Sequence, residues 1–247
     1  MISSQTVKNK FGEKIDLVVE GNTAADTTVV LVHGFGTGKD EDLLLDISDA
    51  LKKDFRIVRF DFSGCGQSEG RQEDIDIEKM AFDLEAILSW VERQWAGNIG
   101  IIAQSMGTFA VSFLSPSNIE KTIFTGIPNG KTAHMINRSQ NRMRSAGGKV
   151  DPEGVSIYPR TSGRIQKVGP NHWRVLREFD PIDSVRSFSQ KTKLIIFKPL
   201  EDEVIGSDYC DDYRNIETAS YVELHGSHNF SKAADRKKLI DKIKMFI

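Results

Sequence analysis

A serine between small residues stands directly after a short apolar run. Residues 98–103 are rich in isoleucine, which favours a buried strand, and apolar residues at near-helical spacing follow in Phe109, Val111, Phe113 and Leu114. Ser105 therefore lies at a strand-to-helix turn, two positions after Ala103 and two before Gly107. Such a turn strains the serine backbone and requires small neighbours. The spacing predicts a nucleophilic serine, with a serine that only caps the helix as the alternative.

Strand and helix patterns alternate through most of the chain around this serine. We expect an N-terminal hairpin of residues 6–9 and 14–19, strands at 28–32, 55–60, 121–125, 193–198 and 220–224, and helices near 43–51, 77–95, 208–216 and 235–247. This alternation predicts an α/β fold, with a mostly parallel sheet and helices on both faces. His33, Asp61 and Ser105 follow three successive strands, at the sheet edge where such folds bind ligands.

The alternation stops between residues 127 and 187, a stretch rich in glycine and proline. Long irregular stretches inside one domain are usually functional. We therefore expect residues 127–187 to form an inserted cap, or lid, over a core made of residues 1–126 and 188–247. This segment is termed the insert below. Within it, residues 132–144 fit a helix, and residues 155–158 and 164–168 fit two strands that pair around a turn.

The insert is strongly basic. Between Lys131 and Glu178 there are ten lysines and arginines but three acidic residues, although the whole chain has a net charge of −2. Two interpretations stay open: the insert attracts an anionic substrate, or its basic face docks on acidic core surface. We expect the pocket to be lined by aromatic and polar residues of the insert, with His134, Met135, Tyr158, His172 and Trp173 as candidates.

Composition excludes several other classes of function. The 247 residues, 39% apolar and 28% charged, suit one domain with a sizeable core, and the near-neutral charge gives no case for nucleic-acid binding. No apolar run suggests a leader or a membrane span, and two cysteines fit a reducing cytoplasmic setting. The five histidines lack metal-ligand spacing, so we expect no metal and no cofactor. The chain could be a monomer or a homodimer.

Five segments together resemble the α/β-hydrolase family, in that family's order along nearly the whole chain. These segments are residues 33–36, 61–68, 103–107, 200–205 and 226–230. The chain is most similar to small cytoplasmic cinnamoyl and feruloyl esterases and to related serine aminopeptidase-like hydrolases. It departs from their pattern at Ala103, where glycine is usual. It departs again at Pro199 and Gly206, which flank residues 200–205, the segment termed the acidic turn below.

The resemblance implies a role for each motif. Ser105 would be the nucleophile, His228 its base and Asp202 the carboxylate that orients the base. The backbone N–H groups of Phe35 and Met106 would form the oxyanion hole. Other residues near these positions compete for two of the roles: His225 for the base, and Glu201, Glu203 and Asp208 for the carboxylate.

This machinery implies a serine hydrolase that cleaves a small carboxylic ester through an acyl-enzyme intermediate. A serine peptidase or a thioesterase would use the same triad, so these remain alternatives. A member of the fold that binds a ligand without catalysis is a third reading. Because Ser105 stands where dehalogenases and epoxide hydrolases need a carboxylate, the sequence disfavours those reactions. The expected partner is a small-molecule ester, with an anionic one favoured by the basic insert.

Overall fold

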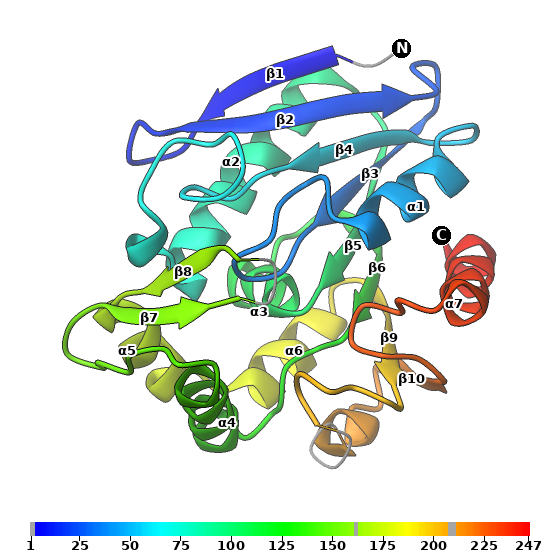
Figure 1. Ribbon diagram of the computed structural model, residues 1–247. Coiled ribbons are helices and arrows are strands. Elements are labelled where there is room, and N and C mark those ends of the chain that lie inside the picture. Colours follow the sequence, from blue (N-terminus) through cyan, green and yellow to red (C-terminus); the bar gives the residue numbers. More distant parts are fainter. Residues whose placement is uncertain (1–2, 161–162, 207–210) are drawn as a thin grey trace.

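Eight strands form one sheet through the molecule in the computed structural model, which describes residues 3–160, 163–206 and 211–247 (Figure 1). The strands are β1 (Ser3–Lys8), β2 (Lys14–Gly21), β3 (Thr27–Val32), β4 (Arg56–Phe60), β5 (Asn98–Gln104), β6 (Ile119–Thr125), β9 (Lys193–Pro199) and β10 (Ala219–Leu224). Their spatial order is β1-β2-β4-β3-β5-β6-β9-β10. β2 pairs antiparallel with β1 and β4, and all other neighbours are parallel. The mostly parallel sheet that the alternation predicts is confirmed.

The central strands are apolar on both faces because helices cover both faces. On β3, residues Val29 to Val32 are completely buried. Val30 pairs in register with Val58 on β4 and with Ile101 on β5. Branched apolar side chains of this kind favour strands that are buried on both sides. This packing makes the sheet a rigid support for the loops at its edge.

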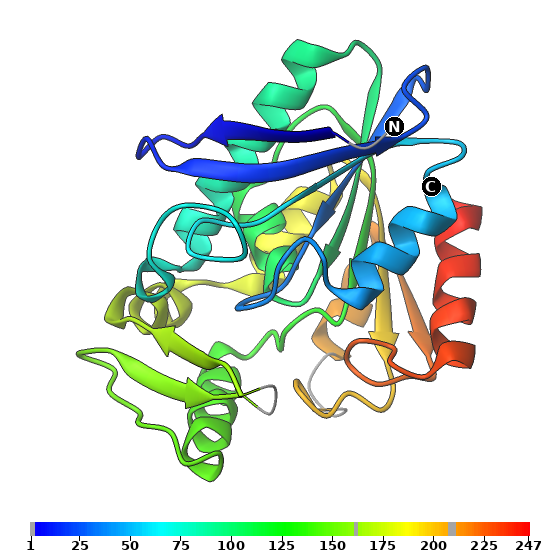
Figure 2. The ribbon, with the colours of Figure 1, turned by 45° about the horizontal axis from the view of Figure 1, so that its top comes forward.

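The helices divide between the two faces of the sheet (Figure 2). α1 (Asp42–Leu51) and α7 (Ala233–Phe246) lie side by side on one face, and their leucines and isoleucines pack in one cluster with Leu31. α2 (Ile77–Gln94), α3 (Met106–Leu114) and α6 (Pro181–Ser189) contribute to the core on the other face. α3 contacts both α2 and α6. Parallel strands between two helical layers bring their carboxyl ends to one common edge.

The insert contains a small substructure of its own. It consists of α4 (Thr132–Ser145), β7 (Ser156–Pro159), β8 (Ile165–Val168) and α5 (Pro170–Glu178), and β7 pairs antiparallel with β8. This confirms the predicted helix and the predicted strand pair. α5 packs against α4, α2 and the short 3-10 helix η1 (Gln72–Asp74). α6 begins within the insert but packs against α3 of the core layer.

After β9, the structure differs from the secondary structure that the sequence pattern predicts. The predicted helix at residues 208–216 begins outside the described residues, and the described part is a short 3-10 helix, η2 (Asp211–Asn215). Tyr213 of η2 is completely buried and donates a hydrogen bond to the carbonyl of Pro128, over 2.9 Å. Within the described residues, no helix has both the length and the apolar character needed to span a membrane.

Candidate active site

Ser105 occupies a sharp turn between β5 and α3. Its backbone has φ 52° and ψ −130°, a conformation that non-glycine residues rarely adopt. Its N–H donates to the carbonyl of Thr125 over 3.0 Å, which ties the turn to the neighbouring strand β6. A Cβ at Gly107 would lie 2.5 Å from the carbonyl oxygen of His33, so this position must be glycine. Ala103, the small residue two positions before Ser105, is completely buried, so the turn has room for its methyl group.

His228 lies between Ser105 and Asp202. Its Nε2 is 3.1 Å from the Ser105 hydroxyl oxygen, and its Nδ1 is 2.8 Å from Asp202 Oδ2. Because an ionised carboxylate only accepts hydrogen bonds, Nδ1–H donates to Asp202, and Nε2 is left to accept the serine proton. Asp202 Oδ1 accepts from the backbone N–H groups of Val204 (2.9 Å) and Ile205 (2.7 Å). The carboxylate is therefore held from both sides.

The competing residues lie elsewhere or make other contacts. The side chain of His225 is 71% exposed, and its nearest acidic group is Glu201 at 3.9 Å. Glu201 also pairs with Lys232. Glu203 Oε2 accepts the backbone N–H of His228 over 3.1 Å, so it supports the histidine loop rather than the imidazole. Asp208 lies outside the described residues.

A second hydrogen bond fixes the histidine loop to the serine strand. Gln104 Nε2 donates to Asn229 Oδ1 over 2.9 Å. These two residues immediately adjoin Ser105 and His228, and all four line one pocket. This pair was not predicted from the sequence, although its members adjoin Ser105 and His228 in the chain.

The two predicted oxyanion donors face the same pocket. Phe35 follows β3 and Met106 begins α3, and both line the cavity beside Ser105. Among the described residues, neither backbone N–H has a hydrogen-bond acceptor. The N–H of Met106 also gains from the positive end of the α3 dipole. The two groups are free to bind an anionic oxygen.

Buried side chains brace the loop that carries Phe35. His33 Nδ1–H donates to the Gly34 carbonyl over 2.6 Å, and Nε2 accepts from the N–H of Phe62 over 3.0 Å. Burial lowers the pKa of His33 to about 4, so the ring is neutral and can accept this bond. Asp61 accepts from the N–H of Lys39 over 2.7 Å and from its ammonium group over 2.6 Å. Both residues thus shape the loops and do not reach the serine.

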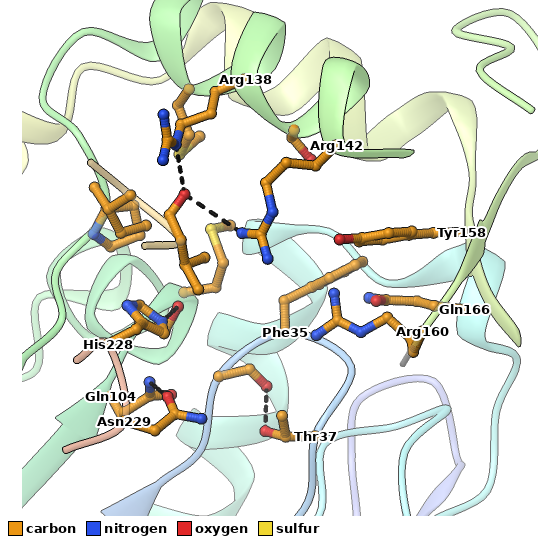
Figure 3. Close-up of a pocket in the computed structure, with 18 of the residues that line it drawn as sticks. Phe35, Thr37, Gln104, Arg138, Arg142, Tyr158, Arg160, Gln166, His228 and Asn229 are labelled. Atoms are coloured by element: carbon orange, nitrogen blue, oxygen red, sulfur yellow. Dashed lines mark hydrogen bonds between the residues drawn. The ribbon is translucent and has the colours of Figure 1, made fainter. Parts of the chain in front are cut away.

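A cavity of about 170 Å³ extends from Ser105 to the insert (Figure 3). Its apolar wall consists of side chains from both the core and the insert, namely Phe35, Pro128, Met135, Met143, Leu176 and Ile205. Its polar side chains include Tyr158, Gln166 and three arginines, Arg138, Arg142 and Arg160. Of the predicted lining residues, Met135, Tyr158 and His172 lie along this cavity.

Two predicted lining residues lie outside this cavity. Trp173 is completely buried inside the insert, where its Nε1 lies 3.3 Å from Ser156 Oγ as a hydrogen-bond donor. The expectation that Trp173 lines the pocket is wrong, because α5 directs this face into the packing of the insert. His134 lies on α4 in a neighbouring groove, also lined by Asn137 and Asn141, and does not line the cavity at Ser105.

Arginines of α4 connect the insert to the acidic turn. Arg138 donates from Nε to the carbonyl of Val204 (2.8 Å) and from Nη2 to the carbonyl of Glu203 (2.9 Å). Arg142, one turn further along α4, reaches the Val204 carbonyl at 3.4 Å. These carbonyls directly follow Asp202, so the insert helps to hold the carboxylate turn. Because the partners are backbone carbonyls, no residue pattern in the sequence predicts this contact.

Two further titratable groups, Glu41 and His172, line the cavity. Burial raises the pKa of Glu41, although a hydrogen bond from Thr37 opposes this effect, and its Oε2 has no hydrogen-bond partner among the described residues. Burial lowers the pKa of His172 to about 4, so its ring is neutral. In the described part of the chain, no group of three or more histidine, cysteine or acidic residues is arranged to hold a metal ion.

Comparisons with known proteins agree with this architecture. A family model described as the alpha/beta hydrolase fold matches residues 27–137. No curated protein matches the sequence. Among solved structures, the chain is similar to the esterase domain of a Rhodothermus marinus protein, with 20% identity and a TM-score of 0.74, over 99% of this chain and 97% of that one.

Two further solved structures share the fold. Est1E from Butyrivibrio proteoclasticus, with ferulic acid bound, is 18% identical with a TM-score of 0.78, over 98% of this chain and 97% of that one. The alpha/beta hydrolase GrgF from Penicillium sp. sh18 is 14% identical with a TM-score of 0.77, over 100% of this chain and 97% of that one. At these identities the likeness concerns the fold, and it extends over the whole chain.

Proposed function

The chain has the α/β-hydrolase fold, and we propose that it is a serine hydrolase that cleaves a small carboxylic ester. One observation carries this proposal. Ser105 Oγ, the His228 ring and the Asp202 carboxylate form one continuous chain of hydrogen bonds, of 3.1 Å and 2.8 Å, that ends at a cavity. A nucleophile, its base and an orienting group in this sequence are the parts that acyl transfer requires.

In the first half-reaction, His228 Nε2 takes the proton of the Ser105 hydroxyl as Oγ attacks the ester carbonyl carbon. The carbonyl oxygen becomes an anion, and the N–H groups of Phe35 and Met106 bind it. His228 then gives its proton to the departing alcohol oxygen, and the acyl group stays on Ser105. In the second half-reaction a water molecule is activated in the same way and releases the acid.

The surrounding contacts explain why these groups need little rearrangement. Asp202 keeps Nδ1 protonated and stabilises the imidazolium that forms during attack. The strained backbone of Ser105 holds Oγ above the turn and beside the free N–H groups. Each oxyanion donor of this type contributes roughly 2.7–4 kcal/mol to transition-state stabilisation.

The cavity limits the size of the substrate. A volume of about 170 Å³ with an apolar wall suits a short acyl chain or one aromatic ring. We propose that the insert, residues 127–187, acts as a cap that supplies one wall of this cavity, and that its basic side chains favour an anionic ester. The neighbours support an ester substrate, since one is the esterase domain of a Rhodothermus marinus protein and Est1E holds ferulic acid.

A fluorophosphonate probe tests the proposal, because it labels a serine that a histidine has activated. We expect the wild-type chain to be labelled on Ser105, and Ser105→Ala to stay unlabelled. A panel of short p-nitrophenyl esters, hydroxycinnamate esters, acyl thioesters and aminoacyl amides then identifies the bond that is cleaved. A folded wild-type chain that takes up no label and hydrolyses none of these substrates would overturn the proposal.

A further inference from the structure

Two guanidinium groups in the cavity have no acidic partner. Arg142 comes from α4 and Arg160 directly follows β7, and both line the cavity that contains Ser105. In the part of the chain that the structure describes, no carboxylate lies within 4.0 Å of either group. Arg142 has the single long contact of 3.4 Å to the Val204 carbonyl, and Arg160 lies over the ring of Tyr158, 4.8 Å from its centroid.

Several other arginines and lysines of the insert have closer partners. Arg138, one turn before Arg142, makes two hydrogen bonds to carbonyls, of 2.8 Å and 2.9 Å. On the surface, Arg174 pairs with Glu178 at 3.0 Å and Lys149 with Asp151 at 2.9 Å. Arg142 and Arg160 lie inside a concave site, where the loss of hydration makes an unpaired charge more costly.

Glu41 does not neutralise these charges. It is the one acidic residue among the described residues that line the cavity, and it bonds to Thr37 in the loop that follows β3. Burial also raises the pKa of Glu41. The cavity is therefore net positive, with a reactive serine at one end and guanidinium groups toward the insert.

Both guanidinium groups point into the cavity. In Figure 3, Arg142 reaches down from α4, and Arg160 extends from beside Tyr158 and Gln166 toward Phe35. His228 lies across the cavity from Arg160 and Tyr158 in the same view. Stacking on Tyr158 fixes Arg160 without using its N–H donors, so the donors remain available for a ligand.

We propose that Arg142 and Arg160 form a carboxylate-binding subsite, and that the substrate is an ester that carries a carboxylate away from the bond that is cleaved. This inference rests on the proposed ester hydrolysis and narrows its substrate class. Guanidinium groups match carboxylates in geometry, and the apolar wall between the subsite and Ser105 accommodates the carbon chain or ring that joins the two ends. A half-ester of a dicarboxylic acid is the simplest compound of this type.

Matched ester pairs test the subsite. One pair is 4-nitrophenyl butyrate and 4-nitrophenyl hemisuccinate, in which the acyl part carries the charge. The other pair is phenyl butyrate and 4-carboxyphenyl butyrate, in which the alcohol part carries it. We expect wild-type kcat/KM to favour the charged member of one pair, which also shows which part of the substrate enters the subsite.

Substitution then assigns the preference to the two arginines. In Arg142→Gln/Arg160→Gln, the ratio of kcat/KM between the charged and the neutral ester should fall on the order of 10- to 100-fold, because hydrogen bonds to a charged group are lost. Arg160→Lys should keep part of the preference because it retains the charge. Arg144→Gln is the matched control, since Arg144 bonds to Asn141 and does not line the cavity.

The outcomes separate this inference from the function on which it rests. If the chain hydrolyses the neutral esters but shows no preference for either charged ester, the subsite is wrong and ester hydrolysis stands. A preference that persists in a folded double variant also overturns the subsite. If no ester is hydrolysed and the fluorophosphonate probe does not react, the proposed function itself fails.

Discussion

The two ends of the cavity differ in how their polar groups are partnered. At the strand end, both oxygens of Asp202 and both ring nitrogens of His228 have partners within the protein, at 2.7–3.1 Å. At the insert end, the guanidinium group of Arg142 has one hydrogen bond of 3.4 Å among the described residues, and that of Arg160 lies over the ring of Tyr158. The groups proposed to react are held by contacts within the protein, whereas the groups proposed to recognise the substrate are left available.

The difference follows from what holds each end in place. The strand end lies on loops that follow the buried central strands of the sheet. The insert end is built on two short strands and two helices that contact the core through α2 and η1. We therefore expect substitutions at the strand end to affect the hydrolysis of all substrates. Changes at the insert end should affect the preference between substrates. The following predictions test that separation.

Ser105→Ala should have the largest effect. Loss of the nucleophile costs on the order of 10⁶ in kcat in a comparable triad. The measurement is hydrolysis of a neutral and a charged ester, with circular dichroism as a check of folding. The rate of hydrolysis should fall to the same extent for both esters. Residual turnover within about tenfold of wild type would place the reactive group elsewhere.

Substitution of His228 should be nearly as damaging as loss of Ser105, because the serine would lack its base. His225→Ala is the matched control, since its side chain is exposed and its nearest acidic group is Glu201. Steady-state kinetics on a neutral ester distinguish the two. If His225→Ala abolished turnover and His228→Ala did not, the base would have to be His225.

Acid should lower the free energy of unfolding, through one buried histidine in the core and one in the insert. Burial lowers the pKa of His33, in the core loop, and of His172, in the insert, to about 4. Unfolding restores a pKa near 6.5, so between pH 6.5 and 4 the unfolded chain binds protons that the folded chain does not, and stability falls as the pH drops. The expected loss is on the order of 2 kcal/mol per histidine from pH 7 to pH 5.

Urea unfolding at several pH values measures this loss. In His172→Gln the drop between pH 7 and pH 5 should be smaller than in wild type, with the contribution of His33 retained. An equally steep drop in the variant would mean that His172 is not buried as a neutral ring, and that the insert is less tightly packed than the core.

Added salt should have the smallest effect and should act on the insert end alone. Raising the salt concentration from about 0.02 M to about 0.5 M shortens the reach of a fixed charge to less than 8 Å. We expect kcat/KM for the carboxylate-bearing ester to fall roughly two- to fivefold, with little change for the neutral ester. Equal responses of the two esters would indicate that the basic side chains serve only solvation and docking.

The strand end was largely predictable from sequence. The apolar runs identify buried strands, and the predicted order of serine, acid and histidine motifs matches three residues that lie together at the sheet edge. Sequence alone left Asp202 in competition with Glu203. The structure separates them, since only Asp202 bonds to the imidazole, whereas Glu203 bonds to the backbone of the same histidine.

The insert end was less predictable for physical reasons. Its helices carry few apolar residues, so periodicity does not decide which face is buried. Trp173 and Tyr158 are both aromatic residues of the insert, yet one packs inside it and the other lines the cavity. The partners of Arg138 are backbone carbonyls, which leave no trace in the residue types around them.

The contacts of Arg138 also bear on how this protein could be rebuilt. Main-chain oxygens are present whatever side chains a turn carries. On the side of the acidic turn, the contact with Arg138 of α4 therefore depends on the course of the backbone and not on the side chains. A chimera that grafts this segment onto another core of the same fold would need to reproduce the course of that turn, but not its residues. The insert could therefore be exchanged, by recombination or by design, while Ser105, His228 and Asp202 stay unchanged.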